Sequence, residues 1–105
     1  MNTELSIKLI RELERAPEQS QRALSQNCGV SLGSIHYCLN ALIEKGYVKA
    51  RNFKNAQNKL AYAYILTPAG LNLKTELTLA FLKRKQAEYD ALQEEIKALE
   101  EDLAR

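Results

Sequence analysis

The fold of this chain is decided by residues 20–46, which read SQRALSQNCGVSLGSIHYCLNALIEKG. Ser20 can accept hydrogen bonds from the free backbone N–H groups at the start of a helix over about residues 21–27. Cys28-Gly29 can end that helix, because glycine adopts the left-handed conformation that often follows a helix. The first half of the stretch therefore predicts one short, capped helix.

The second half of the stretch predicts another helix, over about residues 32–45, with Ser31 as its cap and Gly46 just beyond its end. Its apolar positions fall on one side: Leu32, Ile35, Leu39, Leu42 and Ile43. The opposite side is mostly polar: Gly33, Ser34, His36, Tyr37, Asn40, Ala41 and Glu44. Two short helices joined by a glycine-containing turn are the helix-turn-helix pattern, which many other helical hairpins share.

Upstream, the sequence predicts an amphipathic helix over about residues 4–15, with Thr3 as its cap and Ala16-Pro17 at its end. Its apolar residues recur at helical spacing: Leu5, Leu9, Ile10 and Leu13.

Downstream of Gly46 the apolar period changes from helix to strand. Residues 47–53 and 60–66 are rich in aromatic and β-branched side chains, and residues 54–59 between them have turn composition and no acid. A helix-turn-helix followed by a basic hairpin is a winged helix, which strengthens the helix-turn-helix interpretation.

A final helix is predicted from Pro68 to the end of the sequence, with Thr67 as its cap. Those 38 residues would span about 57 Å at 1.5 Å per residue, so the helix must project beyond its own domain. The side chains expected to pack on that domain are Leu73, Leu77, Ala80 and Phe81. The predicted fold is mainly α (α+β), with a winged helix-turn-helix domain over 1–67 and a long C-terminal dimerisation helix over 68–105.

The exposed part of this helix carries a 3-4 apolar spacing typical of coiled coils. The residues are Leu82, Tyr89, Leu92, Ile96, Leu99 and Leu103. We expect them to pair with a second copy in a homodimer, although a merely amphipathic tail has the same pattern. Parallel pairing would set Glu95 against Glu100 of the second copy, whereas antiparallel pairing centred near Leu92 would set Lys83 and Arg84 opposite Glu101 and Glu100. Charge therefore favours antiparallel pairing, but the orientation stays open.

Charge is distributed unevenly, although the net charge is only +2. Residues 1–87 carry 13 Lys and Arg against six Glu, whereas residues 88–105 carry two basic against seven acidic residues. The basic surplus favours an anionic partner for the first part, although a solvated basic surface would look alike.

Residues that build catalytic and metal sites are scarce. The chain has one histidine, and its only aspartates are Asp90 and Asp102. No nucleophile–base pair, phosphate loop or metal cluster is recognisable, so we expect no enzymatic activity, no cofactor and no metal. Cys28 and Cys38 are expected to be buried structural thiols, since a redox switch needs exposure and a lowered pKa. No apolar run is long enough to span a membrane, and the charged N-terminus does not resemble a secretory signal.

In a helix-turn-helix the N-terminal half of the second helix meets base edges in the major groove. The predicted base-reading residues are Ser31, Gly33, Ser34, His36, Tyr37 and Asn40. The predicted wing and phosphate contacts are Arg22, Lys49, Arg51, Lys54, Asn55, Asn58 and Lys59. Taken singly, each could equally be surface filler. The alternative function is a winged helix used for protein–protein contact without DNA.

The stretches Ser31–Ile35, Leu42–Val48 and Leu66–Gly70 resemble the MarR family of bacterial winged-helix transcription regulators. The similarity extends to the short EPS-associated MarR-type subgroup in Ser20–Arg22, Tyr37–Leu39, Asn52–Phe53, Asn58–Tyr64, Phe81–Lys85 and Glu88–Tyr89. The resemblance implies a cytoplasmic, sequence-specific double-stranded DNA-binding regulator of exopolysaccharide biosynthesis genes. The family's Asp-x-Arg wing motif is missing, as are the flanking helices of its dimer and effector pocket, so no small-molecule effector is expected.

Overall fold

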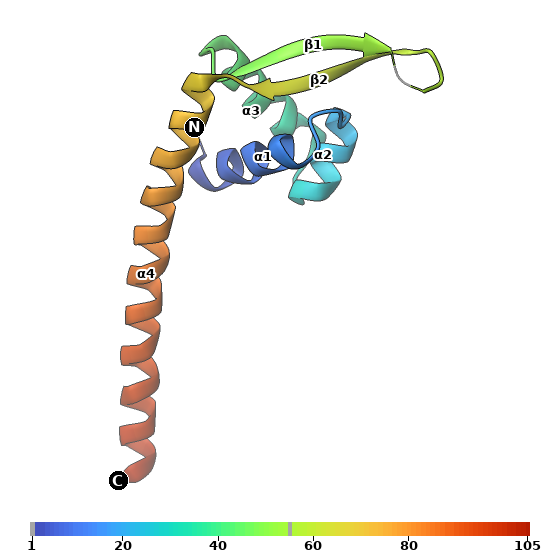
Figure 1. Ribbon diagram of the computed structural model, residues 1–105. Helices are drawn as coiled ribbons and strands as arrows, with labels where there is room; N and C mark the ends of the chain where they lie inside the picture. Colours follow the sequence, from blue (N-terminus) through green and yellow to red (C-terminus); the bar gives the residue numbers. More distant parts are fainter. Residues whose placement is uncertain (1, 55) are drawn as a thin grey trace.

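The structure is a computed structural model that describes residues 2–54 and 56–105. It contains four helices and one hairpin within those ranges, labelled in Figure 1: α1 (Thr3–Arg15), α2 (Gln21–Cys28), α3 (Leu32–Glu44), β1 (Val48–Lys54), β2 (Leu60–Leu66) and α4 (Pro68–Ala104). The predicted winged helix with a long C-terminal helix is confirmed. Among the helices described, none has an apolar stretch long enough to cross a membrane.

Three of the four predicted helix caps are confirmed. The side chains of Ser20, Ser31 and Thr67 each accept a hydrogen bond from the backbone N–H three residues further on. The prediction of Thr3 as the cap of α1 was wrong. Asn2 takes that place, because its extended backbone lets its Oδ1 accept from the Leu5 N–H at 3.1 Å, and Thr3 already belongs to the helix.

One hydrophobic core joins the three short helices and the base of the hairpin. Its fully buried members are Leu9, Ile10, Leu13, Leu24, Ile35, Leu39 and Leu42, and Val48 and Tyr64 close it from the strands. Leu32 was predicted on the buried face of α3 but is 45% exposed. It is the first residue of α3, and the helix enters the core only at Ile35, almost one turn later.

The hairpin is antiparallel, with Val48 opposite Leu66 and Lys54 opposite Leu60. β1 begins one residue later than predicted because the backbone of Tyr47 is used elsewhere. Its N–H donates to the carbonyl of Leu42 at 2.9 Å, which helps to end α3, and its carbonyl accepts from the N–H of Thr67 at 3.1 Å. Tyr47 therefore joins the end of α3 to the start of α4.

The start of α4 is pressed against this junction. A Cβ built on Gly70 would lie 2.1 Å from the carbonyl oxygen of Tyr47, so a glycine is required there for the two backbones to approach. One turn further on, Leu73 and Leu77 pack against the core, and Phe81 is half-buried. Ala80 was predicted to pack here as well, but it is exposed, since it lies on another side of the helix.

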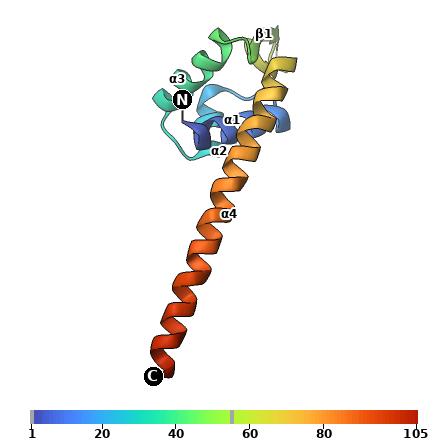
Figure 2. The same ribbon diagram turned by 90° about the vertical axis from the view of Figure 1, so that its left-hand side faces the viewer.

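Beyond Phe81 every residue of α4 is exposed. Figure 1 shows α4 running away from the wing and the short helices, and Figure 2 shows its C-terminal end far from every other element. The molecule is accordingly elongated, with extents of 70 × 27 × 21 Å.

Candidate nucleic-acid interface

The exposed face of α3 gathers the six residues predicted to read bases. Ser31, Gly33, His36, Tyr37 and Asn40 are exposed and Ser34 is half-buried, and none carries a formal charge with the histidine neutral. Tyr37 stands out from the surface with 78% of its area accessible. This is an uncharged surface, rich in hydrogen-bonding groups and about three helical turns long.

Gly33 is not required by the packing of the chain itself. A Cβ built there would meet only Ser31 Oγ, at 4.0 Å, and the residue does not have a positive φ. Its missing side chain leaves the backbone of the first turn of α3 open to the outside. Beside it, Ser34 is held by Ser31, whose Oγ accepts from the Ser34 N–H at 3.1 Å and donates to its Oγ at 2.9 Å.

Two of the predicted base-reading residues belong to a chain of hydrogen bonds that sequence reasoning missed. Asn40 Nδ2 lies 3.0 Å from His36 Nε2, and His36 Nδ1 lies 3.2 Å from Gln21 Oε1. Gln21 Nε2 in turn donates to the hydroxyl of Tyr64 at 3.3 Å. An amide NH₂ only donates and an amide oxygen only accepts, so this arrangement places the proton of a neutral His36 on Nδ1.

The chain of hydrogen bonds ties the exposed face of α3 to α2 and to the base of the wing. Tyr64 is buried, Gln21 is half-buried, and His36 and Asn40 are exposed, so the order runs from the core outward. Gln21 and Tyr64 are 43 positions apart, and no local pattern marks them as partners. Only the packing of the wing on α2 brings them together.

The predicted basic residues of the wing divide between its two faces. Side chains alternate along a strand, so Lys49 and Arg51 share one face of the hairpin, and Lys54 lies on the other with Tyr64, which faces α2. Tyr62 lies on the Tyr64 face too, with the two rings stacked at a centroid distance of 6.2 Å. Arg51 instead borders the loop that joins α1 to α2.

The remaining predicted contacts lie at the wing tip and on α2. Asn58 has φ +60°, a left-handed conformation that asparagine tolerates better than most residues, so it shapes the turn. Asn58, Lys59 and Arg22 are exposed. The predicted contact Asn55 lies outside the described residues.

A groove of about 740 Å³ separates the start of α2 from the wing. Gln19, Ser20 and Gln21 line one side, and Lys54 and Tyr62 are among the residues on the other. The groove is open, so the distal part of the wing stands clear of the helices, while Tyr64 nearer its base contacts Gln21 of α2.

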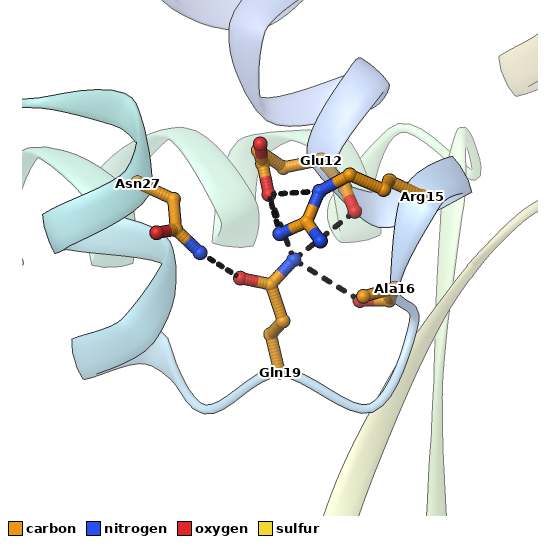
Figure 3. Close-up of polar contacts among 5 residues, drawn as sticks. All are labelled: Glu12, Arg15, Ala16, Gln19 and Asn27. Carbon is orange, nitrogen blue, oxygen red and sulfur yellow. Dashed lines mark hydrogen bonds and ion pairs between the residues drawn. The ribbon is translucent and has the colours of Figure 1, made fainter.

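The loop that joins α1 to α2 is held by polar contacts of Gln19, which Figure 3 shows. Gln19 is almost fully buried. Its Nε2 lies within hydrogen-bonding distance of the carbonyls of Glu12 and Ala16 and of Glu12 Oε2, at 3.0–3.2 Å. Its Oε1 accepts from Asn27 Nδ2 at 2.7 Å. One side chain thus bonds the carbonyls of Glu12 and Ala16 at the end of α1 and joins them to α2.

Glu12 completes this junction as an anion. Arg15 Nη2 lies 2.7 Å from Glu12 Oε2. The hydrogen bonds from Arg15 and then from Gln19 hold the pKa of the Glu12 carboxyl below its usual value, because both stabilise the charged form.

Both cysteines are buried, as predicted. Burial raises the pKa of the Cys28 and Cys38 thiols, which keeps them protonated near neutral pH, and the Sγ of Cys38 lies 3.7 Å from Ser6 Oγ. Within residues 2–54 and 56–105, no group of three His, Cys, Asp or Glu side chains could hold a metal ion.

The six residues predicted to form a dimer are all exposed, with 47–87% of their areas accessible. They follow one another along a single stripe of α4, with the acidic residues beside it. Nothing within the described part of the chain covers this stripe.

Residues 3–49 match the family of winged helix-turn-helix DNA-binding domains. No curated protein matches the sequence significantly. Among solved structures, the PcaV transcriptional regulator of Streptomyces coelicolor superposes with a TM-score of 0.64 at 18% identity, over 78% of this chain and 57% of its own length. A MarR/EmrR family transcriptional regulator of Acinetobacter sp. ADP1 gives 0.59 at 23% identity, over 93% and 73%.

Staphylococcus aureus MarR, solved in complex with salicylate and kanamycin, gives a TM-score of 0.56 at 20% identity, over 91% of this chain and 67% of its own length. At these identities the likeness concerns the fold, and this chain spans little more than half the length of the PcaV regulator. The chain is therefore similar over residues 3–49 to winged helix-turn-helix DNA-binding domains, and it has the winged-helix fold of MarR-type regulators.

Proposed function

We propose that this protein is a transcriptional regulator that binds double-stranded DNA in a sequence-specific manner as a homodimer. The observation that carries the proposal is the uncharged, hydrogen-bonding face of α3, standing beside a wing that carries Lys54 and Lys59. The match of residues 3–49 to DNA-binding domains supports it independently.

In this proposal α3 enters the major groove with its first turns. Asn40 can bond adenine through its amide, and the hydroxyls of Ser31 and Ser34 offer further donors and acceptors to base edges or phosphate. Both ring nitrogens of His36 are engaged by Gln21 and Asn40, so we propose that His36 contributes by orienting the Asn40 amide. Gly33 leaves room for close approach, since nothing inside the chain uses its space. Tyr37 can stack or bond a phosphate.

The basic residues supply affinity without sequence preference. Lys54, Lys59 and Asn58, together with Asn55, are proposed to reach the backbone or the minor groove, and Arg22 a phosphate beside α2. Lys49 and Arg51 share the face of the hairpin that borders the α1–α2 loop, so we propose that they contribute less than Lys54.

We further propose the division of labour that the sequence predicts, with DNA binding in residues 1–67 and dimerisation in α4. The exposed stripe from Leu82 to Leu103 supports this, because large apolar side chains in such a row are usually covered in solution. The resemblance to the EPS-associated MarR-type subgroup supports a bacterial, cytoplasmic regulator with exopolysaccharide genes as targets.

The experiment is selection of bound DNA from a random pool, followed by anisotropy titrations at several salt concentrations. We expect one enriched sequence, and a log affinity that falls by about 0.9 per phosphate neutralised for each tenfold rise in salt. Asn40→Ala should relax the base preference, whereas Lys59→Ala should weaken all sequences alike. Genomic footprinting then tests whether exopolysaccharide genes carry the sites.

Lys54→Ala and Arg51→Ala are the matched pair for the wing. Both remove one exposed charge from the same strand, but only Lys54 is on the face that looks toward α2. Lys54→Ala should lower the salt slope more than Arg51→Ala. A wild-type protein that enriches no sequence and shows no salt slope would refute DNA binding and favour the protein–protein module.

A further inference from the structure

The apolar stripe of α4 begins well before the exposed part of the helix. Positions a and d of its heptad continue upward from Leu82 through Thr78 and Thr75 to Leu71, and all four residues are exposed. They lie on a different side of α4 from Gly70, Leu73 and Leu77, which pack on the core. The unpartnered face therefore runs alongside the winged-helix domain and not only below it.

The upper end of this face is hollowed. Leu71, Lys74, Thr75, Thr78 and Leu79 line a depression of about 370 Å³. The first four occupy successive d, g, a and d positions, the four that surround an inserted side chain in a coiled coil. The two small threonines between Leu71 and Leu79 leave the space that a large side chain would fill.

Large and small residues are arranged along the face in a complementary way. Its upper half has the small residues Thr75 and Thr78, whereas its lower half has Ile96, Leu99 and Leu103. An identical helix running in the opposite direction would bring the large half of each copy onto the small half of the other. We propose that the occupant is α4 of a second copy, antiparallel, with the two-fold axis at Ala87.

In this register each residue at heptad position a faces a residue at position d of the second copy, and each residue at position d faces one at position a. The layers are Leu71 with Leu103, Thr75 with Leu99, Thr78 with Ile96, Leu82 with Leu92, and Lys85 with Tyr89, each formed twice. Leu99 of the second copy enters the hollow around Thr75. The seam covers all of the exposed apolar a and d residues from Leu71 to Leu103.

The charged side chains near the seam also favour the antiparallel register centred on Ala87. Parallel pairing would stack Lys85 on Lys85, whereas here each Lys85 meets Tyr89 and keeps its bond to Glu88 of its own helix, at 3.1 Å. Lys74, whose ammonium already pairs with Glu14 of α1, comes beside Asp102 of the second copy at both ends. The like charges brought near the axis are the two Glu88 carboxylates, each paired with its own Lys85.

A shift of the axis toward Leu92 gives the register expected from the sequence, which brings Lys83 and Arg84 toward Glu101 and Glu100 of the second copy. That shift is nevertheless less favourable. With Thr78 opposite Leu103, the side chain of Leu71 has no partner and the hollow below it stays empty. That shift also sets Glu88 beside Glu95 of the other copy on both sides of the axis. The register centred on Ala87 avoids both costs, and it spaces the two winged-helix domains about 36 Å apart along the helices at the level of Thr75.

This inference rests on the proposed homodimer and not on DNA binding. The test uses the full-length variants Ala87→Cys and Glu101→Cys, each carrying a nitroxide spin label. Double electron–electron resonance measures the distance between the two labels of a dimer. Both sites are exposed and point away from the seam. Wild-type protein treated with the label is the control, because Cys28 and Cys38 are buried.

We expect about 25–30 Å between labels at residue 87 and about 50 Å at residue 101, since the latter are 28 residues apart along the paired helices. A parallel pair would give about 25–30 Å at both sites, and an axis near Leu92 would shorten the second distance to about 40 Å or less; either result overturns the inference. A monomer in light scattering, with no dipolar signal, overturns the proposed homodimer itself.

Discussion

Leu42 and Leu92 are the same residue in two helices of one chain, yet Leu42 is fully buried and Leu92 is 53% exposed. Leu42 belongs to the winged-helix unit, residues 3–81, where α1, α3 and the hairpin cover one another. Leu92 belongs to the distal helix, residues 82–104, in which every residue is exposed. The first region buries its apolar side chains within the chain, whereas the second exposes them, and we propose that a second copy covers them.

The largest expected effects come from replacing each of these two leucines with alanine. Leu42→Ala should lower the free energy of unfolding by about 2–5 kcal/mol, because it leaves a cavity in a packed core. Leu92→Ala should leave the unfolding of the winged-helix unit unchanged and raise the dimer dissociation constant at least about tenfold. Urea unfolding and sedimentation over a dilution series measure the two effects. Equal losses of unfolding free energy would contradict the division.

Two glycines give the next largest contrast. Gly70→Ala should cost about 2–3 kcal/mol of unfolding free energy, since its Cβ would meet the backbone of Tyr47. Gly33→Ala is the matched control, because its Cβ would enter open space, and we expect it to stabilise α3 by about 0.5–1 kcal/mol. If Gly33→Ala nevertheless weakens DNA binding, the space at Gly33 serves the partner and not the fold.

A smaller effect is expected from Gln21, which holds His36 from α2. Gln21→Ala should reduce discrimination at the base read by α3 by about 1 kcal/mol, roughly fivefold, without changing the salt slope. Gln26→Ala, an exposed glutamine of the same helix, is the control. Competition binding against single-base variants of the selected site measures the difference, and an unchanged preference would mean that His36 needs no support from α2.

The smallest effect concerns pH. The lowered pKa of Glu12 means that its hydrogen bonds to Arg15 and Gln19 stabilise the winged-helix unit above the pKa of the unfolded chain. This contribution is lost as the pH falls from the ordinary carboxyl value of 4.5 through the lowered pKa of the folded state, when the carboxylate takes up a proton. Glu12→Gln should therefore lose less stability than wild type over that window, and Glu18→Gln controls for the removed charge. Parallel unfolding curves at each pH provide the measurement.

Much of the fold follows from local sequence. Ser20, Ser31 and Thr67 cap the helices that their positions predict, and β2 spans the predicted residues 60–66. Caps and periodicity act within a few residues, which is why a sequence reveals them. The boundary at Tyr47 and the burial of Leu32 were misjudged because each depends on which distant backbone or side chain lies alongside.

The candidate site shows the same division. The exposed residues of α3 were predicted from the helical period, because one side of an amphipathic helix must face outward. The separation of Lys54 from Arg51 is also implied by strand alternation, once the register is known. Two features join residues whose side chains meet only after packing. They are the chain of hydrogen bonds that runs from Asn40 through His36 and Gln21 to Tyr64, and the hydrogen bonds of Gln19 to the end of α1. No local spacing in the sequence predicts either of them.

The sequence by itself determined the order of elements, three of the four helix caps, the basic wing and the apolar heptad of α4, since each arises from neighbouring residues and their periods. Only the tertiary structure decided that Gly70 must be a glycine, that Gln21 supports His36, and that the face from Leu71 to Leu82 is open and hollowed. These depend on backbones and side chains meeting across the fold, where close packing and the direction of each hydrogen bond leave few arrangements possible.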